Sequence, residues 1–271
     1  MTASREWELQ ISEAQLASMT KDLNEAHRES IPVMRAQADL FAEELADTAP
    51  RERRLGRRGF LLGLGGVGAS LALAACSSSS SSKTASSSPS AAGSPMMSAS
   101  GSSQYVGDLK VVALATALEN QAVGAYTAAL AAATAGKLGA VPAAVGTFAQ
   151  TAMSQHADHA KAWNVVLQSA NVPTITGVPL SNQPQVLSEL GAVTTVGGVA
   201  NLALELENQA AQTYLFAAGN VTSAGGIATA ASIAPVEAMH AAILQFVLGQ
   251  YPVPDTFLGT SKAANPSLLT V

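Results

Sequence analysis

The same five-residue segment occurs twice in this chain, in surroundings that favour helices. Leu-Glu-Asn-Gln-Ala spans residues 118–122 and again residues 206–210. A tyrosine follows each glutamate by seven positions, at Tyr126 and Tyr214. Both copies lie in Ala-rich stretches without strand-type alternation, so each is predicted to lie within a helix. Such a repeat indicates that the body of the chain consists of two related structural units.

A second pair of segments extends the repeat. Residues 156–160 (HADHA) correspond to residues 237–241 (EAMHA). The offset from Glu119 to His159 is 40 residues and that from Glu207 to His240 is 33, which fits a longer loop in the first unit. The body is therefore predicted to be a tandem of helical hairpins related by a pseudo-twofold axis.

Helix breakers divide the body into four helices, predicted over residues 108–135, 142–170, 194–218 and 224–250. Gly-Lys-Leu-Gly interrupts the chain at 136–139, Asn-Val-Pro at 171–173 and Gly-Asn at 219–220. The connection 171–193 is long, with a short helix expected to start at Pro184. Short, long and short connections predict an all-α four-helix bundle with one long crossover.

Charged residues are nearly absent from these helices. Glu119 is the only charged residue between residues 111 and 135. Between residues 224 and 250, Glu237 is the only charged residue and His240 is the only histidine. A carboxylate in an apolar helix is costly unless it is paired or coordinated. Residues three apart share a helix face, so Glu237 with His240, and His156 with His159, can aim at one point. We therefore expect six polar residues to converge in the bundle: Glu119, His156, His159, Glu207, Glu237 and His240.

This arrangement resembles the ferritin-like di-metal carboxylate superfamily, which includes bacterioferritin-type and rubrerythrin-type proteins. The resemblance covers roughly residues 108–251. It implies a di-iron or manganese centre in which Glu119 and Glu207 are terminal carboxylates and Glu237 is a bridge. His159 and His240 would be the nitrogen ligands. By the same resemblance, the candidate catalytic residues are Tyr126 and Tyr214, as redox tyrosines or as hydrogen-bond partners of the ligands.

His156 departs from the family pattern, which has a bridging glutamate at this position. The site would therefore hold three carboxylates and three imidazoles, leaving two divalent ions less neutralised and favouring metals that accept imidazole. This departure argues against ordinary iron oxidation. It allows a single ion, or two ions with one bridge as in manganese catalases. The remaining alternative is a buried polar network without metal.

Two motifs at the end of the N-terminal segment indicate export. Arg57-Arg58-Gly-Phe-Leu-Leu resembles the twin-arginine signal, and the apolar run 60–75 is too short to span a bilayer comfortably. Leu-Ala-Ala-Cys at 73–76 resembles a lipobox and contains the only cysteine, Cys76. The resemblance implies recognition by the twin-arginine translocase. It also implies acylation of Cys76 by lipid and anchoring on the outer face of the cytoplasmic membrane or cell envelope.

The segment before these motifs, residues 1–56, is charged and long for a signal. It contains one apolar stripe before Pro32 and a second set after it: Leu9, Leu16, Met19 and Leu23, then Val33, Leu40, Phe41 and Leu45. It is either a small helical pair or the result of a start codon placed too early, and the sequence leaves both open. Residues 77–104 are predicted to be a Ser-rich tether, 105–253 the bundle and 254–271 a tail.

The charge balance limits the function. From residue 76 onward the chain has five basic and eight acidic residues, which excludes a nucleic-acid-binding body. The leading hypothesis is a lipid-anchored protein that reacts bound iron or manganese with dioxygen or peroxide, as a ferroxidase-, peroxidase- or catalase-like oxidoreductase. The alternative is a non-enzymatic interaction or stress-protection protein with a metal-free bundle. Low surface charge predicts a homodimer in either case.

Overall fold

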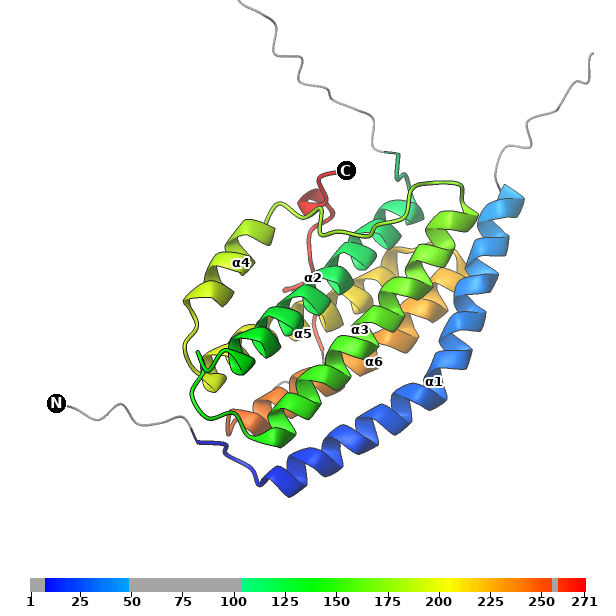
Figure 1. Cartoon of the computed structure of the whole chain (residues 1–271). Helices are drawn as coiled ribbons and strands as arrows, with labels where there is room; N and C mark the ends of the chain where they lie inside the picture. Colours follow the sequence, from blue (N-terminus) through cyan, green and yellow to red (C-terminus); the bar gives the residue numbers. More distant parts are fainter. Residues whose placement is uncertain (1–7, 49–103, 255–257) are drawn as a thin grey trace, which may run out of the picture. The chain divides into compact units, whose positions relative to one another are not determined.

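The computed structural model describes residues 8–48, 104–254 and 258–271 (Figure 1). Within these ranges the regular elements are helices, and the only β-type pairing is an isolated bridge between Leu180 and Leu269. The helices are α1 (Glu13–Thr48), α2 (Asp108–Thr134), α3 (Ala143–Ser169), α4 (Gln183–Ala192), α5 (Val196–Asn220), α6 (Ala224–Val247) and the 3₁₀ turn η1 (Pro266–Leu268). The predicted all-α bundle with one long crossover is confirmed.

The bundle consists of two helical hairpins. Helix α2 packs on α3, α5 packs on α6, and α2 contacts α5 across the pseudo-twofold. The crossover between α3 and α5 contains α4, which lies against both α2 and α5. Thr195 and Ser223 cap α5 and α6 by accepting hydrogen bonds from the backbone N–H groups of Gly198 and Gly226. These caps fix the residue at which each helix of the second hairpin begins.

Helix α1 is a single 36-residue helix that continues through Pro32. It bends along its length (Figure 1), as expected where proline removes one backbone hydrogen bond. It contacts both α3 and α6 and belongs to the same compact unit as the bundle. The N-terminal extension thus supplies a fifth helix to the folded body, as one continuous element and not as a pair separated at Pro32.

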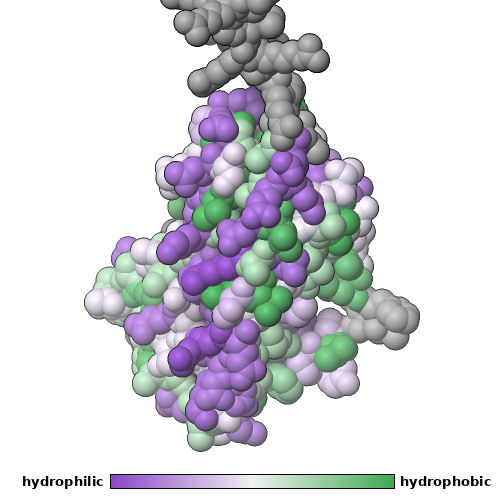
Figure 2. Space-filling model, turned by 90° about the vertical axis from the view of Figure 1, so that its right-hand side faces the viewer, coloured by the Kyte–Doolittle hydropathy of each residue, from purple (hydrophilic) through white to green (hydrophobic). Residues whose placement is uncertain are grey.

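The inner face of α1 follows a helical period. Its buried residues lie three, four or seven positions apart, with one adjacent pair at the end, as on one face of a packed helix: Leu16, Thr20, Leu23, His27, Met34, Ala38, Phe41 and Ala42. Val33 and Leu40, which the sequence grouped with the apolar set, are 58% and 48% exposed. The side of the molecule that carries α1 shows a band of hydrophilic residues in Figure 2. The helix is therefore amphipathic, with its apolar face on the bundle.

A close approach between α1 and the start of α6 fixes this docking. A Cβ atom at Gly225 would lie 2.5 Å from the backbone nitrogen of Phe41 and 2.8 Å from the carbonyl oxygen of Gln37. Only glycine allows the two backbones to meet at this distance. Beside it, the Ser223 hydroxyl donates a hydrogen bond to Glu44. The contact joins the C-terminal half of α1 to the bundle.

Helix α6 is, in the described part of the chain, the one helix long and apolar enough to cross a membrane. Half of its most apolar window is nevertheless buried inside the protein. It also carries Glu237 and His240, which are both 0% exposed. We therefore interpret α6 as a core helix of the bundle.

Two apolar clusters surround a polar layer. One contains Met34, Phe41, Trp163, Tyr214 and Ile233, and the other contains Leu16, Leu23, Tyr126, Phe148 and Leu244. In α2, α3, α5 and α6 the buried glutamates and histidines fall in sequence between residues of the two clusters. Helix α1 contributes to both clusters, and His27 lies at the corresponding level between them.

Candidate metal centre

The structure brings all six predicted ligands together in this polar layer. Each is at most 2% exposed: Glu119 on α2, His156 and His159 on α3, Glu207 on α5, and Glu237 and His240 on α6. The spacing of three residues within α3 and within α6 directs both members of each pair to the same side of the helix, as expected from helical geometry. The bundle therefore places donors from four helices around one point.

The six residues form two overlapping groups of possible metal donors. One group contains Glu119, His156, His159 and Glu237, and the other contains His156, Glu207, Glu237 and His240. Within each group the donor atoms lie within 4.8 Å of one another. His156 and Glu237 belong to both groups and so occupy the shared positions between them. Their arrangement follows the pseudo-twofold of the repeat.

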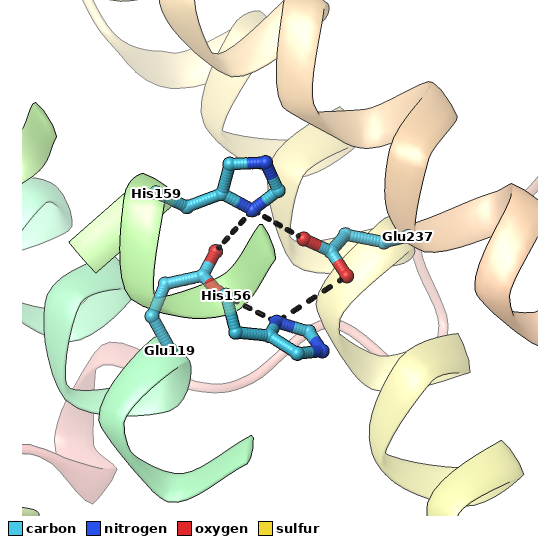
Figure 3. A group of neighbouring side chains, drawn as sticks. All are labelled: Glu119, His156, His159 and Glu237. Carbon is cyan, nitrogen blue, oxygen red and sulfur yellow. Dashed lines mark hydrogen bonds and ion pairs between the residues drawn. The ribbon is translucent and has the colours of Figure 1, made fainter. Parts of the chain in front are cut away.

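The ring of His159 faces two carboxylates, those of Glu119 and Glu237 (Figure 3). Its Nδ1 atom lies 2.9 Å from Glu237 Oε1 and 3.5 Å from Glu119 Oε1. Despite the short distance, neither His159 Nδ1 nor Glu237 Oε1 has an aligned hydrogen-bond partner. Buried polar atoms left in this state are rare and require an explanation. A cation shared by the nitrogen and the oxygen would satisfy both atoms.

His156 uses both ring nitrogens, each toward a different group. Its Nδ1 atom lies 2.7 Å from Glu119 Oε2 and 3.6 Å from Glu237 Oε2. Its Nε2 atom lies 3.1 Å from Glu207 Oε1, on the other side of the ring. The imidazole therefore stands between the two groups, where the ferritin-like pattern has a carboxylate.

His240 is held by a residue that the sequence analysis missed. Its Nε2 atom lies 2.8 Å from the side-chain oxygen of Gln155, and its Nδ1 atom lies 3.2 Å from both Glu207 Oε2 and Glu237 Oε2. Because Nε2–H donates to Gln155, Nδ1 is the nitrogen left to face the carboxylates. Metal-binding histidines are commonly oriented in this way. Gln155 precedes His156 directly, but a buried glutamine carries no signal in the sequence that marks this role.

The two tyrosines bind the carboxylates of the opposite repeat. Tyr126 donates a 2.5 Å hydrogen bond to Glu207 Oε1, and Tyr214 donates one to Glu119 Oε1. The indole N–H of Trp163 donates to the Tyr214 hydroxyl at 2.9 Å. Burial, and then the nearby charge of Glu207, raises the pKa of Tyr126 well above its usual value, so its hydroxyl stays protonated and donates.

Burial and mutual repulsion would each raise the pKa of neighbouring carboxylates. The pKa values of Glu119 and Glu207 are instead lowered. Burial alone would raise the pKa of Glu119, but the charge of His159 and the hydrogen bond from His156 lower it to about 2. His156 and His240 likewise hold the pKa of Glu207 well below its ordinary value, against the effect of burial. The imidazoles beside each carboxylate outweigh the repulsion between carboxylates.

The imidazoles are affected in the opposite direction. Burial would lower the pKa of His159, but the negative charges of Glu119 and Glu237 beside its ring raise it to about 9. The pKa values of His156 and His240 are raised for the same reason, with Glu237 and Glu207 as the main charges. Without metal, three imidazolium groups thus neutralise three carboxylates. A metal cation has to displace these protons.

The residues present fit a metal ion. Imidazole nitrogens and carboxylate oxygens are the donors that iron and manganese accept, and the site offers three of each. The unpartnered atoms of His159 and Glu237 provide places for an ion between them. A small hollow between α2 and α5 also reaches Glu119 and His156; it is lined further by Leu118, Gln121, Ala122, Leu206, Gln209 and Ala210.

Two other acidic residues close to the ligands in sequence face away from the centre. Glu205, two residues before Glu207, is exposed. Asp158 forms an ion pair with Arg35 of α1, with Nη2 and Oδ1 3.1 Å apart. Arg57 and Arg58 of the predicted export signal and Cys76, the predicted lipidation site, lie outside the described residues.

The sequence profile of the ferritin-like domain matches residues 107–250, which is more than half of the chain and contains all six residues of the centre. No curated protein and no solved structure matches the chain.

Proposed function

Since the chain belongs to the ferritin-like domain family, we propose that it binds one or two iron or manganese ions at the centre formed by Glu119, His156, His159, Glu207, Glu237 and His240. The observation that carries this proposal is the pair of overlapping donor groups that share His156 and Glu237. A merely structural polar cluster would not need to repeat one donor set in both halves of the bundle.

Each half of the site has its own role in holding metal. Glu119 and His159 would bind an ion on one side, Glu207 and His240 on the other, and Glu237 would offer one carboxylate oxygen to each side. His156 offers Nδ1 to the first side and Nε2 to the second, in place of a second bridging carboxylate. Tyr126 and Tyr214 hold the terminal carboxylates by their hydroxyl groups.

Iron or manganese bound here would supply redox chemistry toward dioxygen or peroxide, by binding and polarising the oxidant. The chain supports such chemistry by excluding water, since every proposed ligand is buried. It also keeps two tyrosine protons next to the carboxylates that face the ions. We therefore propose an oxidoreductase of the ferroxidase, peroxidase or catalase type.

The net charge of the site depends on how many ions it holds and on the protonation of His156. With a neutral His156 and three carboxylates, the site would carry one net positive charge with two divalent ions and one net negative charge with a single ion. Loss of both ring protons would add one negative charge and let His156 bind through both nitrogens. Charge alone is therefore compatible with one ion and with two.

The test is metal content and thermal shift of the full-length protein. Metal-free protein is reconstituted anaerobically with Fe²⁺ or Mn²⁺, desalted and analysed for bound metal, beside Glu237→Ala and the exposed control Glu205→Ala. We expect one or two ions in wild type and in the control, and a large loss in Glu237→Ala. If wild type binds no metal after reconstitution, the metal-binding proposal is wrong and the metal-free alternative takes its place.

The alternative function is a non-enzymatic interaction or stress-protection protein. It is favoured by one observation: three imidazolium groups beside three carboxylates form a charge-balanced network that stands without metal. In that case the melting temperature of wild type is the same with and without Fe²⁺ or Mn²⁺.

We also propose that the protein is exported and anchored by lipid at Cys76, with the twin-arginine translocase as partner. The support is the order and spacing of the Arg57-Arg58 motif, the apolar run and the lipobox. This pathway carries folded proteins, so the full-length chain, with α1 in place, would take up its metal in the cytoplasm before processing at Cys76 removes residues 1–75. Lysine at both arginines should keep the protein in the cytoplasm, and Cys76→Ala should abolish incorporation of labelled palmitate.

A further inference from the structure

All four histidines of the chain lie in one connected cluster. The ring centroid of His27 is 5.3 Å from that of His159. His159 is 6.2 Å from His156, and His156 is 5.1 Å from His240. Three of these residues belong to the proposed centre. His27, on α1, belongs to neither donor group and has no role in the function proposed above.

His27 is buried with one ring nitrogen unpaired, and its packing does not explain why a polar side chain stands there. It is 3% exposed, and its Nε2 atom has no hydrogen-bond partner. A buried imidazole nitrogen normally has one, because an unpartnered polar group costs free energy. On the inner face of α1, His27 lies between Leu23 and Met34, which belong to different apolar clusters. An apolar side chain at this position would continue the stripe at lower cost.

A carboxylate lies outside His27, toward solvent. Asp158 precedes His159 on α3, its side chain is 36% exposed, and its charge acts on the His27 ring. Arg35, two helical turns after His27 on α1, is bound to Asp158 at 3.1 Å. From the surface inward, the contact between α1 and α3 therefore presents an exposed carboxylate, an unpartnered imidazole and a proposed metal ligand.

We propose that His27 is the first buried binding position of a divalent cation on its way to the centre, between Asp158 at the surface and His159 in the core. This inference rests on the proposed metal-binding function. Asp158 attracts the cation, His27 replaces part of its hydration shell, and His159 takes it over with Glu119 and Glu237. Arg35 competes with the cation for Asp158 and thereby slows its passage.

In this proposal α1 contributes residues to the metal path in addition to packing on the bundle. It contributes the imidazole and the guanidinium, while α3 contributes the carboxylate and the final ligand. The hollow between α2 and α5, which reaches Glu119 and His156 from the other side of the bundle, is the competing route. The two routes use different residues, so variants distinguish them.

The experiment measures how fast metal-free full-length protein takes up Co²⁺, followed by its visible absorption in a stopped-flow instrument, and Mn²⁺, followed by loss of the aqueous EPR signal. In His27→Phe the ring stays but its nitrogens are gone, and we expect loading slower by about tenfold or more. The final stoichiometry should equal that of wild type, because His27 is not a permanent ligand. Met34→Leu, on the same face of α1, is the matched control and should load at the wild-type rate.

Two surface variants test the same path without touching the core. Asp158→Asn should slow loading, and Arg35→Gln should accelerate it most at low ionic strength, since the carboxylate is then free to attract cations. If His27→Phe folds poorly, the metal-uptake rates of these two variants still test the proposed path. Ala210→Phe, which narrows the hollow between α2 and α5, should leave the rate unchanged.

Equal loading rates for wild type, His27→Phe, Asp158→Asn and Arg35→Gln would overturn the inference, as would slow loading confined to Ala210→Phe. Wild type that takes up no metal at all would instead overturn the proposed function. The two failures are therefore distinguishable.

Discussion

Tyr126 and Glu207 are joined by a 2.5 Å hydrogen bond that links the first repeat to the second, and Tyr214 and Glu119 form the reciprocal bond. Each hairpin thus orients a carboxylate of the other. Neither repeat contains a complete half-site, because its own glutamate depends on a tyrosine across the pseudo-twofold. The duplicated sequence therefore gives an interlocked centre and not two independent ones.

Removing one of these hydroxyl groups should cost both stability and metal affinity. Tyr126→Phe removes the shorter of the two hydrogen bonds at Glu207 Oε1 and leaves only His156 Nε2 beside this buried oxygen, so we expect about 1–3 kcal/mol lower free energy of unfolding. Metal affinity should also fall, because the carboxylate loses its orientation. Tyr105→Phe is the control: its hydroxyl donates to the carbonyl oxygen of Pro173, away from the centre, so metal affinity should stay unchanged. Equal metal affinity in both variants would contradict an orienting role for Tyr126.

The metal-free protein should lose stability as the pH rises from about 6.5 to about 9. Burial works against the charged form of His159, but Glu119 and Glu237 raise its pKa from 6.5 to about 9. A group whose pKa is raised by folding stabilises the protein fully below its unfolded pKa, and this stabilisation disappears as the pH passes its folded pKa. Chemical denaturation of metal-free protein across this interval measures the loss, and His159→Gln should reduce it.

Metal affinity should change in the opposite direction over the same interval. The imidazoles must lose their protons to bind an ion, so binding releases protons and tightens as the pH rises toward about 9. Calorimetric titration with Mn²⁺ in buffers of different ionisation enthalpy counts the protons released. An affinity for metal that is independent of pH would show that the ion binds elsewhere than at these histidines.

The sequence located the bundle well because its helix ends are marked by strong breakers. The loop at 136–139 and the Asn-Val-Pro segment each follow a helix that ends close to the expected residue, whereas α5 continues through Gly219 and ends at Asn220. The six buried polar residues were also recognisable, since isolated glutamates in Ala-rich helices stand out. That they come together follows from the repeat, which requires equivalent positions to face the same axis.

Other features depend on contacts between distant segments and had no local signal. Pro32 suggested two separate short helices before the export motifs. In the structure α1 runs through the proline and packs on the bundle. His27 lies on its apolar face, four residues after Leu23, but nothing in the sequence indicated what that face covers. The lowered pKa values of Glu119 and Glu207 were missed because the histidines pair with carboxylates on other helices.

Replacing His156 by glutamate should have opposite effects on the metal-free and metal-loaded states. Without metal, a fourth carboxylate replaces an imidazolium that now neutralises Glu119 and Glu207, so the melting temperature should fall. With two divalent ions, four carboxylates balance four positive charges. The thermal shift on adding Fe²⁺ should therefore be larger than in wild type, and His156→Gln, which adds no charge, is the control. Equal thermal shifts for His156→Glu and wild type would show that His156 does not lie between two ions.

Gly225→Ala should detach the C-terminal half of α1. The new Cβ would meet the backbone of Phe41 and of Gln37 closer than real contacts allow, and neither backbone can rotate away as a side chain could. Overpacking of this kind costs about 1–3 kcal/mol when the structure yields locally. If α1 lifts off instead, burial of Met34 and Phe41 is lost, at about 1.5–3 kcal/mol for each side chain.

The matched control is Gly124→Ala in α2. This glycine is also inside a helix, but no atom lies within 4 Å of the Cβ position, so alanine should stabilise the protein by about 0.5–1 kcal/mol through helix propensity. Thermal melting and limited proteolysis of the two full-length variants, without metal, provide the comparison. We expect Gly225→Ala to melt lower and to be cut within residues 30–48, and Gly124→Ala to melt higher and stay uncut there. A Gly225→Ala protein as stable and as resistant as Gly124→Ala would mean that α1 does not rest on α6, and the path of metal past His27 would lose its structural basis.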